Sequence, residues 1–137
     1  MKKILIGFVA VFVTFEVLDA IIHGGILMST YAAMPHTWRP DMMNKLWILH
    51  FVKISTAFFF TYVFAKGYEG KGIMEGVRYG FYLGMIVSAG FAFGTYSMVD
   101  IGKSLAIQWF FYSLIEYIIA GVVVSLVFGK KEAVAKA

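Results

Sequence analysis

The chain has 137 residues, of which 61% are hydrophobic and only 15% are charged, and its formal net charge is +4. A water-soluble domain carries about 25% charged residues, and a core this small cannot bury so much apolar surface, so a single membrane domain is predicted. The absence of cysteine excludes disulfides, thiolate metal sites and iron–sulfur clusters, and the basic residues flank apolar runs, which indicates membrane topology and no nucleic-acid partner.

Four apolar segments are each long enough to cross a bilayer, which takes about 20 helical residues. We expect an all-α bundle of four transmembrane helices running alternately up and down, because open strands would leave unpaired backbone groups in hydrocarbon. The predicted spans are residues 4–28, 42–65, 74–97 and 104–128.

The first segment follows Lys2 and Lys3, as the apolar part of a signal peptide would. No small-x-small cleavage site follows it, and Glu16 and Asp19 interrupt the apolar run. We therefore expect it to be retained as the first span.

The three connections differ in length. The sequence STYAAMPHTWRPD, residues 29–41, is a long connector that contains both prolines. Asp41 at its end is expected to cap the second helix. The glycine-rich KGYEGKG, residues 66–72, breaks the helix before the third span, and VDIGK, residues 99–103, is the last turn.

Lysine and arginine predict the orientation. Eight lie on the side of the termini and three on the other: Lys2, Lys3, Lys66, Lys71, Arg78, Lys130, Lys131 and Lys136 against Arg39, Lys45 and Lys103. This bias predicts both termini in the cytoplasm, in the inner membrane of a prokaryote. Trp38, Trp47 and Trp109 fall near the outer ends, as an interfacial belt would.

Small residues recur every four positions along the third span: Gly76, Gly80, Gly84, Ser88 and Ala92. On a helix they form one smooth stripe against which a second backbone can pack closely. Packing inside the bundle is the simpler interpretation, and a homodimer face is the alternative.

Ionisable residues interrupt three of the four spans. The first span contributes three at spacing i, i+3 and i+7, the second contributes two at i and i+3, and each set shares one helix face. Counting 1.5 Å per residue places all of them near or above mid-membrane, in the outer half. The members are Glu16, Asp19, His23, His50, Lys53 and Glu116.

The second and fourth spans run back beside the first, which allows depths to be matched. A connector symmetric about its midpoint places His23 level with His50, and Asp19 level with Lys53. Counting back from the lysines after the second and fourth spans makes Glu116 level with Lys53. The sequence therefore predicts one buried polar layer.

A charge at the centre of a bilayer costs about 2.5–3.5 kcal/mol, so these side chains are expected to face inward. Lys53 is the one fixed cation available to Glu16, Asp19 and Glu116. Either some of these carboxylates carry a proton or a cation lies among them. A purely structural ion pair is the plainer interpretation.

The favoured function is a proton or metal-cation site in a small transporter or channel-like protein. Asp19, His23, His50 and Glu116, with Glu16, supply the oxygen and nitrogen donors that Zn²⁺, Mn²⁺ or Fe²⁺ accept. Lys53 opposes a tight metal site because an ammonium repels a metal ion.

The alternative function is an accessory or cofactor-binding subunit of a larger membrane complex. His23 and His50 at equal depth would ligate a b-type haem, or the helices would pack against partner subunits or a second copy of the chain. An enzyme ranks last, because the chain has no HExxH or GxSxG motif and no phosphate-binding loop.

Overall fold

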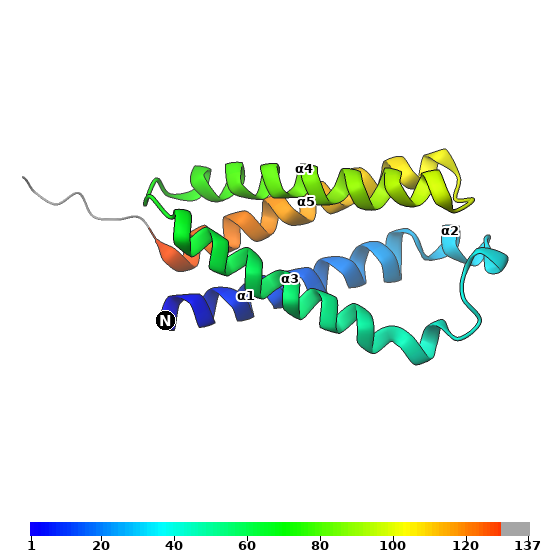
Figure 1. The fold of residues 1–137 in the computed structure, drawn as a ribbon, viewed down its shortest axis with the longest axis horizontal. Coiled ribbons are helices and arrows are strands. Elements are labelled where there is room, and N and C mark those ends of the chain that lie inside the picture. The colour runs from blue at the N-terminus through cyan, green and yellow to red at the C-terminus, as the bar shows by residue number, and fades with distance from the viewer. Residues whose placement is uncertain (130–137) are drawn as a thin grey trace, which may run out of the picture.

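The computed structural model describes residues 1–129, in which every regular element is helical (Figure 1). The predicted all-helical class is confirmed for these residues. The elements are α1 (Lys2–Ile21), a π-helical turn η1 (Ile22–Ile26), α2 (Met28–Ala32), two 3₁₀ turns η2 (Pro35–Thr37) and η3 (Met42–Lys45), α3 (Leu46–Gly67), α4 (Ile73–Met98) and α5 (Lys103–Phe128).

Four helical stretches in this part of the chain are long and apolar enough to span a membrane. Their bounds lie within two residues of the predicted segments: Lys2–Ile26, Met42–Gly67, Ile73–Met98 and Lys103–Phe128. The three lysines that close the sequence, at 130, 131 and 136, lie outside the described residues.

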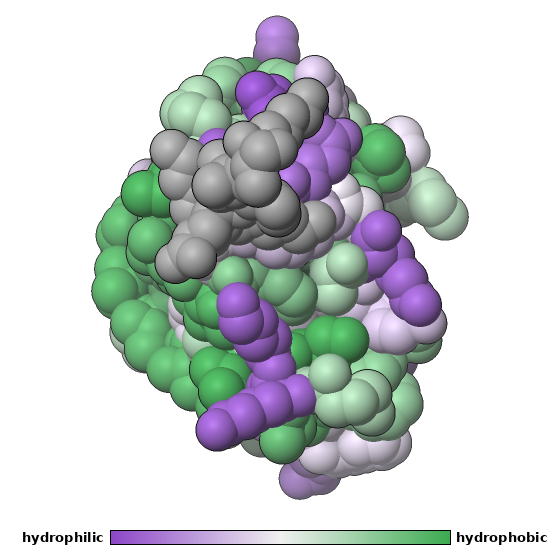
Figure 2. Space-filling view, turned by 90° about the vertical axis from the view of Figure 1, so that its left-hand side faces the viewer, coloured by the Kyte–Doolittle hydropathy of each residue, from purple (hydrophilic) through white to green (hydrophobic). Residues whose placement is uncertain are grey.

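The long helices alternate in direction, so the molecule has two ends (Figure 1). We call the end with the N-terminus, Phe128 and the α3–α4 loop the terminus end, and the end with residues 27–45 and the α4–α5 turn the connector end. Figure 2 faces the terminus end, where hydrophilic side chains project and hydrophobic side chains gather mainly along the left-hand side of the view. This distribution is typical of a membrane protein.

The packing is uneven among the four long helices. α4 lies along α5 for most of its length, and α1 packs against both α5 and α3, whereas α3 barely touches α5. In the terminus half the helices close around an apolar cluster. It contains Phe15, Phe60, Tyr117 and Val124, and the Phe15 ring centroid lies 5.3 Å from that of Tyr117 and 6.1 Å from that of Phe60.

The small residues of α4 form its contact with α5. All five residues of the predicted stripe are buried. A Cβ atom added at Gly80 would overlap the carbonyl oxygen of Tyr117, and one at Gly76 would overlap that of Gly121. The stripe is used for packing within the chain and is covered by α5, so it is not free to form a homodimer face.

α3 leaves the bundle in its connector half. Its buried residues, Ala57, Phe60, Thr61 and Phe64, all belong to the half near the terminus end. The stretch 47–52 is exposed throughout, and in Figure 1 this half of α3 diverges from the other helices. The predicted bundle is therefore closed at one end and open at the other.

The prediction that Asp41 caps the second helix is wrong. Asp41 precedes the 3₁₀ turn and makes no capping hydrogen bond with its side chain. Its carboxylate lies 3.0 Å from Arg39 Nε and 3.1 Å from Lys45 Nζ. Hydrogen bonds from these two cations lower the pKa of Asp41, so it stays ionised and ties the connector to the start of α3.

Candidate functional site

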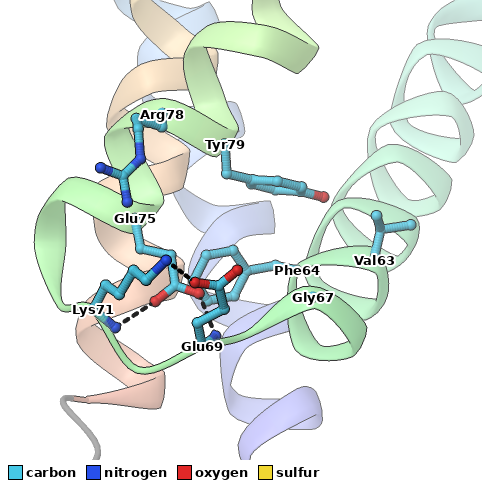
Figure 3. A pocket seen from close by; sticks show the side chains of 8 residues that line it. All are labelled: Val63, Phe64, Gly67, Glu69, Lys71, Glu75, Arg78 and Tyr79. Atoms are coloured by element: carbon cyan, nitrogen blue, oxygen red, sulfur yellow. Dashed lines mark hydrogen bonds and ion pairs between the residues drawn. The ribbon is translucent and has the colours of Figure 1, made fainter.

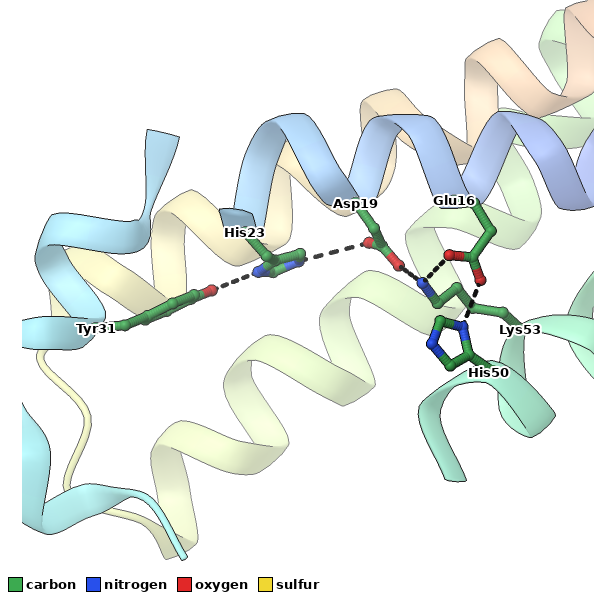
Figure 4. A network of polar contacts seen from close by, with 6 residues as sticks. All are labelled: Glu16, Asp19, His23, Tyr31, His50 and Lys53. Carbon is green, nitrogen blue, oxygen red and sulfur yellow. Dashed lines mark hydrogen bonds and ion pairs between the residues drawn. The ribbon is translucent and has the colours of Figure 1, made fainter. Parts of the chain in front are cut away.

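Lys53 of α3 bridges two carboxylates of α1 in the connector half (Figure 4). Its Nζ lies 3.1 Å from Glu16 Oε2 and 3.0 Å from Asp19 Oδ2. The spacing i, i+3 places both carboxylates on one face of α1, toward α3. The pairing of Asp19 with Lys53 is the one that equal depth predicts.

His50 lies deeper than the depth argument predicts. Its Nδ1 is 2.9 Å from Glu16 Oε1, so it is level with Glu16 and not with His23. The argument treats α1 and α3 as antiparallel about a symmetric connector. α3 instead crosses α1 at an angle, which shifts the level at which each of its residues meets α1 (Figure 1).

His23 lies in the π-helical turn that ends the first span. The backbone N–H of Leu27 donates to the carbonyl of Ile22 at 2.8 Å, five residues back. Such turns often occur at functional sites because they re-aim a side chain. Here the His23 Nε2 lies 3.7 Å from Asp19 Oδ1, and its Nδ1 lies 2.5 Å from the hydroxyl of Tyr31.

Tyr31, in α2, joins the connector to this network. Its hydroxyl accepts a hydrogen bond from Trp109 Nε1 at 2.8 Å, and its backbone carbonyl accepts one from Trp38 Nε1 at 3.1 Å. Its ring is stacked on that of His23 with centroids 5.8 Å apart. Burial raises the pKa of Tyr31 to about 12, so the hydroxyl keeps its proton at neutral pH.

The sequence reasoning missed Tyr31 and misplaced Trp109. The sequence predicts Trp109 at the lipid interface. In the structure it is 6% exposed and lies in an apolar cluster between α5 and the connector. A tryptophan near the outer end of one span and a tyrosine just beyond another are a weak signal, since both also fit an interfacial belt.

Glu116 of α5 is the most buried member of the cluster. Its residue is 5% exposed, and its Oε1 has no hydrogen-bond partner among the described residues. Asp19 of α1 and Lys53 of α3 are its charged neighbours. A buried polar atom without a partner is rare and calls for a physical explanation.

The other five side chains are only partly buried. The exposed fraction of the side chain rises from 19% for Lys53, through 27% for Asp19, 29% for Glu16 and 36% for His23, to 56% for His50. The expected buried layer is therefore found at Glu116 alone. The reason is the divergence of α3, which leaves the α1–α3 side of the network uncovered.

The nitrogen and oxygen atoms that could bind a metal ion are instead paired with one another within the network. No group of three or more His, Asp or Glu residues in the described part of the chain is arranged to hold a metal ion. His23 and His50 contact different carboxylates, and both ring nitrogens of His23 have protein neighbours. The geometry thus favours neither the metal ligand set nor the paired haem ligands that the sequence suggests.

The apolar cluster separates the network from the terminus end. Phe15, one residue before Glu16, is 5% exposed and contacts Phe60 and Tyr117 by ring edges and faces. The packed aromatic side chains therefore lie between the network and the terminus end.

A cavity of about 680 Å³ lies between α3 and α4 at the terminus end (Figure 3). Its polar groups mainly bind the loop itself. The Glu75 carboxylate accepts the backbone N–H groups of Glu69 at 2.5 Å and Lys71 at 2.7 Å, and the Lys71 ammonium pairs with the Glu69 carboxylate. The geometry is that of a loop fastened to the first turn of α4.

Comparison of the chain with protein-family models, with curated proteins and with solved structures finds no match.

Proposed function

We propose that the chain is a small membrane protein in which Glu16, Asp19, Lys53 and Glu116 form a proton site of a transporter or channel-like protein. The observation that carries this proposal is the buried Glu116, whose Oε1 has no hydrogen-bond partner among the described residues. With Asp19 and Glu16, it makes three carboxylates that share one lysine, Lys53, so the site has an excess of negative charge. A proton compensates the excess negative charge without needing a cage of ligands.

The uneven packing supports a site that opens toward one side. The network is partly exposed along the diverging half of α3, and the apolar cluster around Phe15 and Phe60 closes it from the terminus end. With the orientation that the basic residues predict, the site exchanges protons with the outside in this conformation. Passage to the other side requires that the cluster opens.

The proposal is tested by the Glu116→Gln variant, which keeps the shape and removes the titratable group. In liposomes that contain the parent protein and a trapped pH indicator, we expect proton uptake when a membrane potential is imposed. Glu116→Gln should abolish this uptake. Asp100→Asn, which changes an exposed carboxylate in the α4–α5 turn, should match the parent.

A second readout reports the proton directly. A protonated carboxyl group absorbs in the infrared as a carboxylic acid, and this band should be present in the parent protein in membranes and lost or shifted in Glu116→Gln. Uptake that persists unchanged in Glu116→Gln, with no carboxylic acid band in the parent, would refute the proton site.

The exposed half of α3 favours a second candidate, a subunit of a larger membrane complex. Trp47 is 66% exposed, Phe51 62% and His50 more than half exposed, and a polar group at this depth is costly against lipid. A partner helix seated there would cover His50. The protein purified in mild detergent would then co-elute with a stoichiometric partner in size-exclusion chromatography. Loss of that partner in the His50→Leu variant would place the binding surface on this half of α3.

A further inference from the structure

We infer that Tyr31 and His23 form the relay through which Asp19, and through it Glu116, exchanges protons with the connector side. The inference rests on the proposed function and extends it, since it assigns the route. It depends on a row of polar atoms from the connector into the span, drawn in Figure 4: Tyr31 Oη, the two ring nitrogens of His23, and the Asp19 carboxylate.

The direction of the hydrogen bonds follows from Trp109. An indole N–H only donates, so the Tyr31 hydroxyl is the acceptor in their 2.8 Å contact. The hydroxyl hydrogen then has His23 Nδ1 as its acceptor at 2.5 Å. Because Nδ1 accepts, the neutral imidazole carries its hydrogen on Nε2, which is the nitrogen that faces Asp19.

This arrangement is set for transfer in one sequence of steps. Tyr31 Oη takes a proton from a hydronium ion at the connector, which becomes water, while its own hydroxyl proton moves to His23 Nδ1. The Nε2 proton then moves to Asp19 Oδ1. Only O–H and N–H bonds form and break, and the sum is one proton moved from hydronium to the carboxyl groups. His23 is left with its hydrogen on Nδ1, and it regains the Nε2–H form when Nδ1 releases that proton to water and Nε2 takes one up.

The gap between His23 and Asp19 means that the second proton transfer requires a movement of the imidazole ring. The distance of 3.7 Å exceeds the length of an ordinary hydrogen bond, about 3.2 Å at most, so the imidazole must move before the proton passes. The π-helical turn provides for this. Gly24 and Gly25, which follow His23, are exposed and have open space around them.

Charged and titratable groups from four elements act on His23. Asp19 of α1 and Lys53 of α3 are its charged neighbours, while Tyr31 of α2 occupies Nδ1. Glu116 of α5 acts on Asp19, its own charged neighbour. The two nearest full charges have opposite signs, which suits a group that accepts and releases a proton in turn.

The tautomer of His23 is the first test, and it needs no functional assay. The chain has three histidines, so ¹⁵N-labelled histidine gives three ring systems, assigned with His36→Gln and His50→Gln. We expect the Nε2–H form for His23 at neutral pH in the parent, and a mixture of forms in Tyr31→Phe. Tyr96→Phe, an exposed tyrosine at the same end of the molecule, should leave the His23 signals unchanged. An Nδ1–H form in the parent would overturn the relay.

The rate of proton uptake is the second test. Loss of one acid–base group in a transfer step typically costs a factor of about 10² or more, so Tyr31→Phe and His23→Gln should each slow uptake at least ~10-fold. The infrared band of the carboxylic acid should persist in both. Tyr96→Phe and His36→Gln should match the parent.

The outcomes separate the two proposals. If Glu116→Gln leaves uptake unchanged, the proton site itself is wrong. If Glu116→Gln abolishes uptake while Tyr31→Phe and His23→Gln run at the parent rate, the site stands and the relay is wrong.

Discussion

Lys53 is the residue on which the α1–α3 contact in the connector half depends. It is the least exposed member of the partly buried network and touches both Glu16 and Asp19. Removal of one partner of a buried charge pair typically costs about 3–5 kcal/mol, because the other charge stays desolvated. At the surface the same pairing is worth about 0–1 kcal/mol. The loss of unfolding free energy on removal of Lys53 can therefore be compared with these two limits.

We expect Lys53→Met to lower the free energy of unfolding by about 3 kcal/mol, since two carboxylates lose their cation. The matched control is Lys45→Met, which breaks an exposed pair with Asp41 and should cost at most about 1 kcal/mol. Titration of both variants with sodium dodecyl sulfate, followed by far-ultraviolet circular dichroism, measures the difference. Equal stability of the two variants would contradict a bridging role for Lys53.

At the scale of elements, α4 and α5 form the firmest unit of the molecule. Close approach of their backbones is possible because glycines face each other, Gly76 and Gly80 on α4 and Gly121 on α5. Without a hydrophobic driving force between helices in lipid, such close packing supplies much of the association energy. α3 has no comparable stripe, and it is held by its buried half near the terminus end and by the contacts of Lys53 and His50 with α1.

A single methyl group tests this contact. Gly80→Ala places Cβ against the carbonyl oxygen of Tyr117, so the helices must separate, and we expect a loss of about 1–3 kcal/mol. Gly90→Ala on the same helix meets no atom within 4 Å and should be close to neutral. Thermal unfolding in one detergent compares the two, and a Gly80→Ala variant as stable as Gly90→Ala would show that the backbones are not in contact.

For the whole molecule, the main question is which end faces the cytoplasm. The basic residues of the terminus end predict that it is inside, and the connector end would then meet the exterior. In that orientation the open half of the bundle, with Tyr31 at the connector end, faces the exterior, which would supply the protons for the relay.

Cysteine labelling decides the orientation cleanly, because the chain has no native cysteine. We expect Asp100→Cys, at the connector end, to react in intact cells with an impermeant maleimide. Glu69→Cys, in the α3–α4 loop, should react after permeabilisation alone. The reverse labelling pattern would show that the termini lie outside, and the open half of the bundle would then face the cytoplasm.

Local pattern was enough to predict the helices and the faces of α1 and α4. Each apolar run must satisfy its own backbone hydrogen bonds in hydrocarbon, so the four helices follow from composition and length. The helical period alone places Glu16 beside Asp19 and aligns Gly76, Gly80 and Gly84. Neither conclusion needs any information about neighbouring helices.

What the tertiary structure decided is how the helices meet. The contact of His50 with Glu16 depends on the angle at which α3 crosses α1, and the bond from Trp109 to Tyr31 joins residues 78 positions apart. Glu116 is buried while its neighbours Asp19 and Lys53 are partly exposed, and this contrast depends on α3 leaving the bundle. Crossing angles and rotations arise from side chains of several helices packing at once, and no spacing within one segment encodes them.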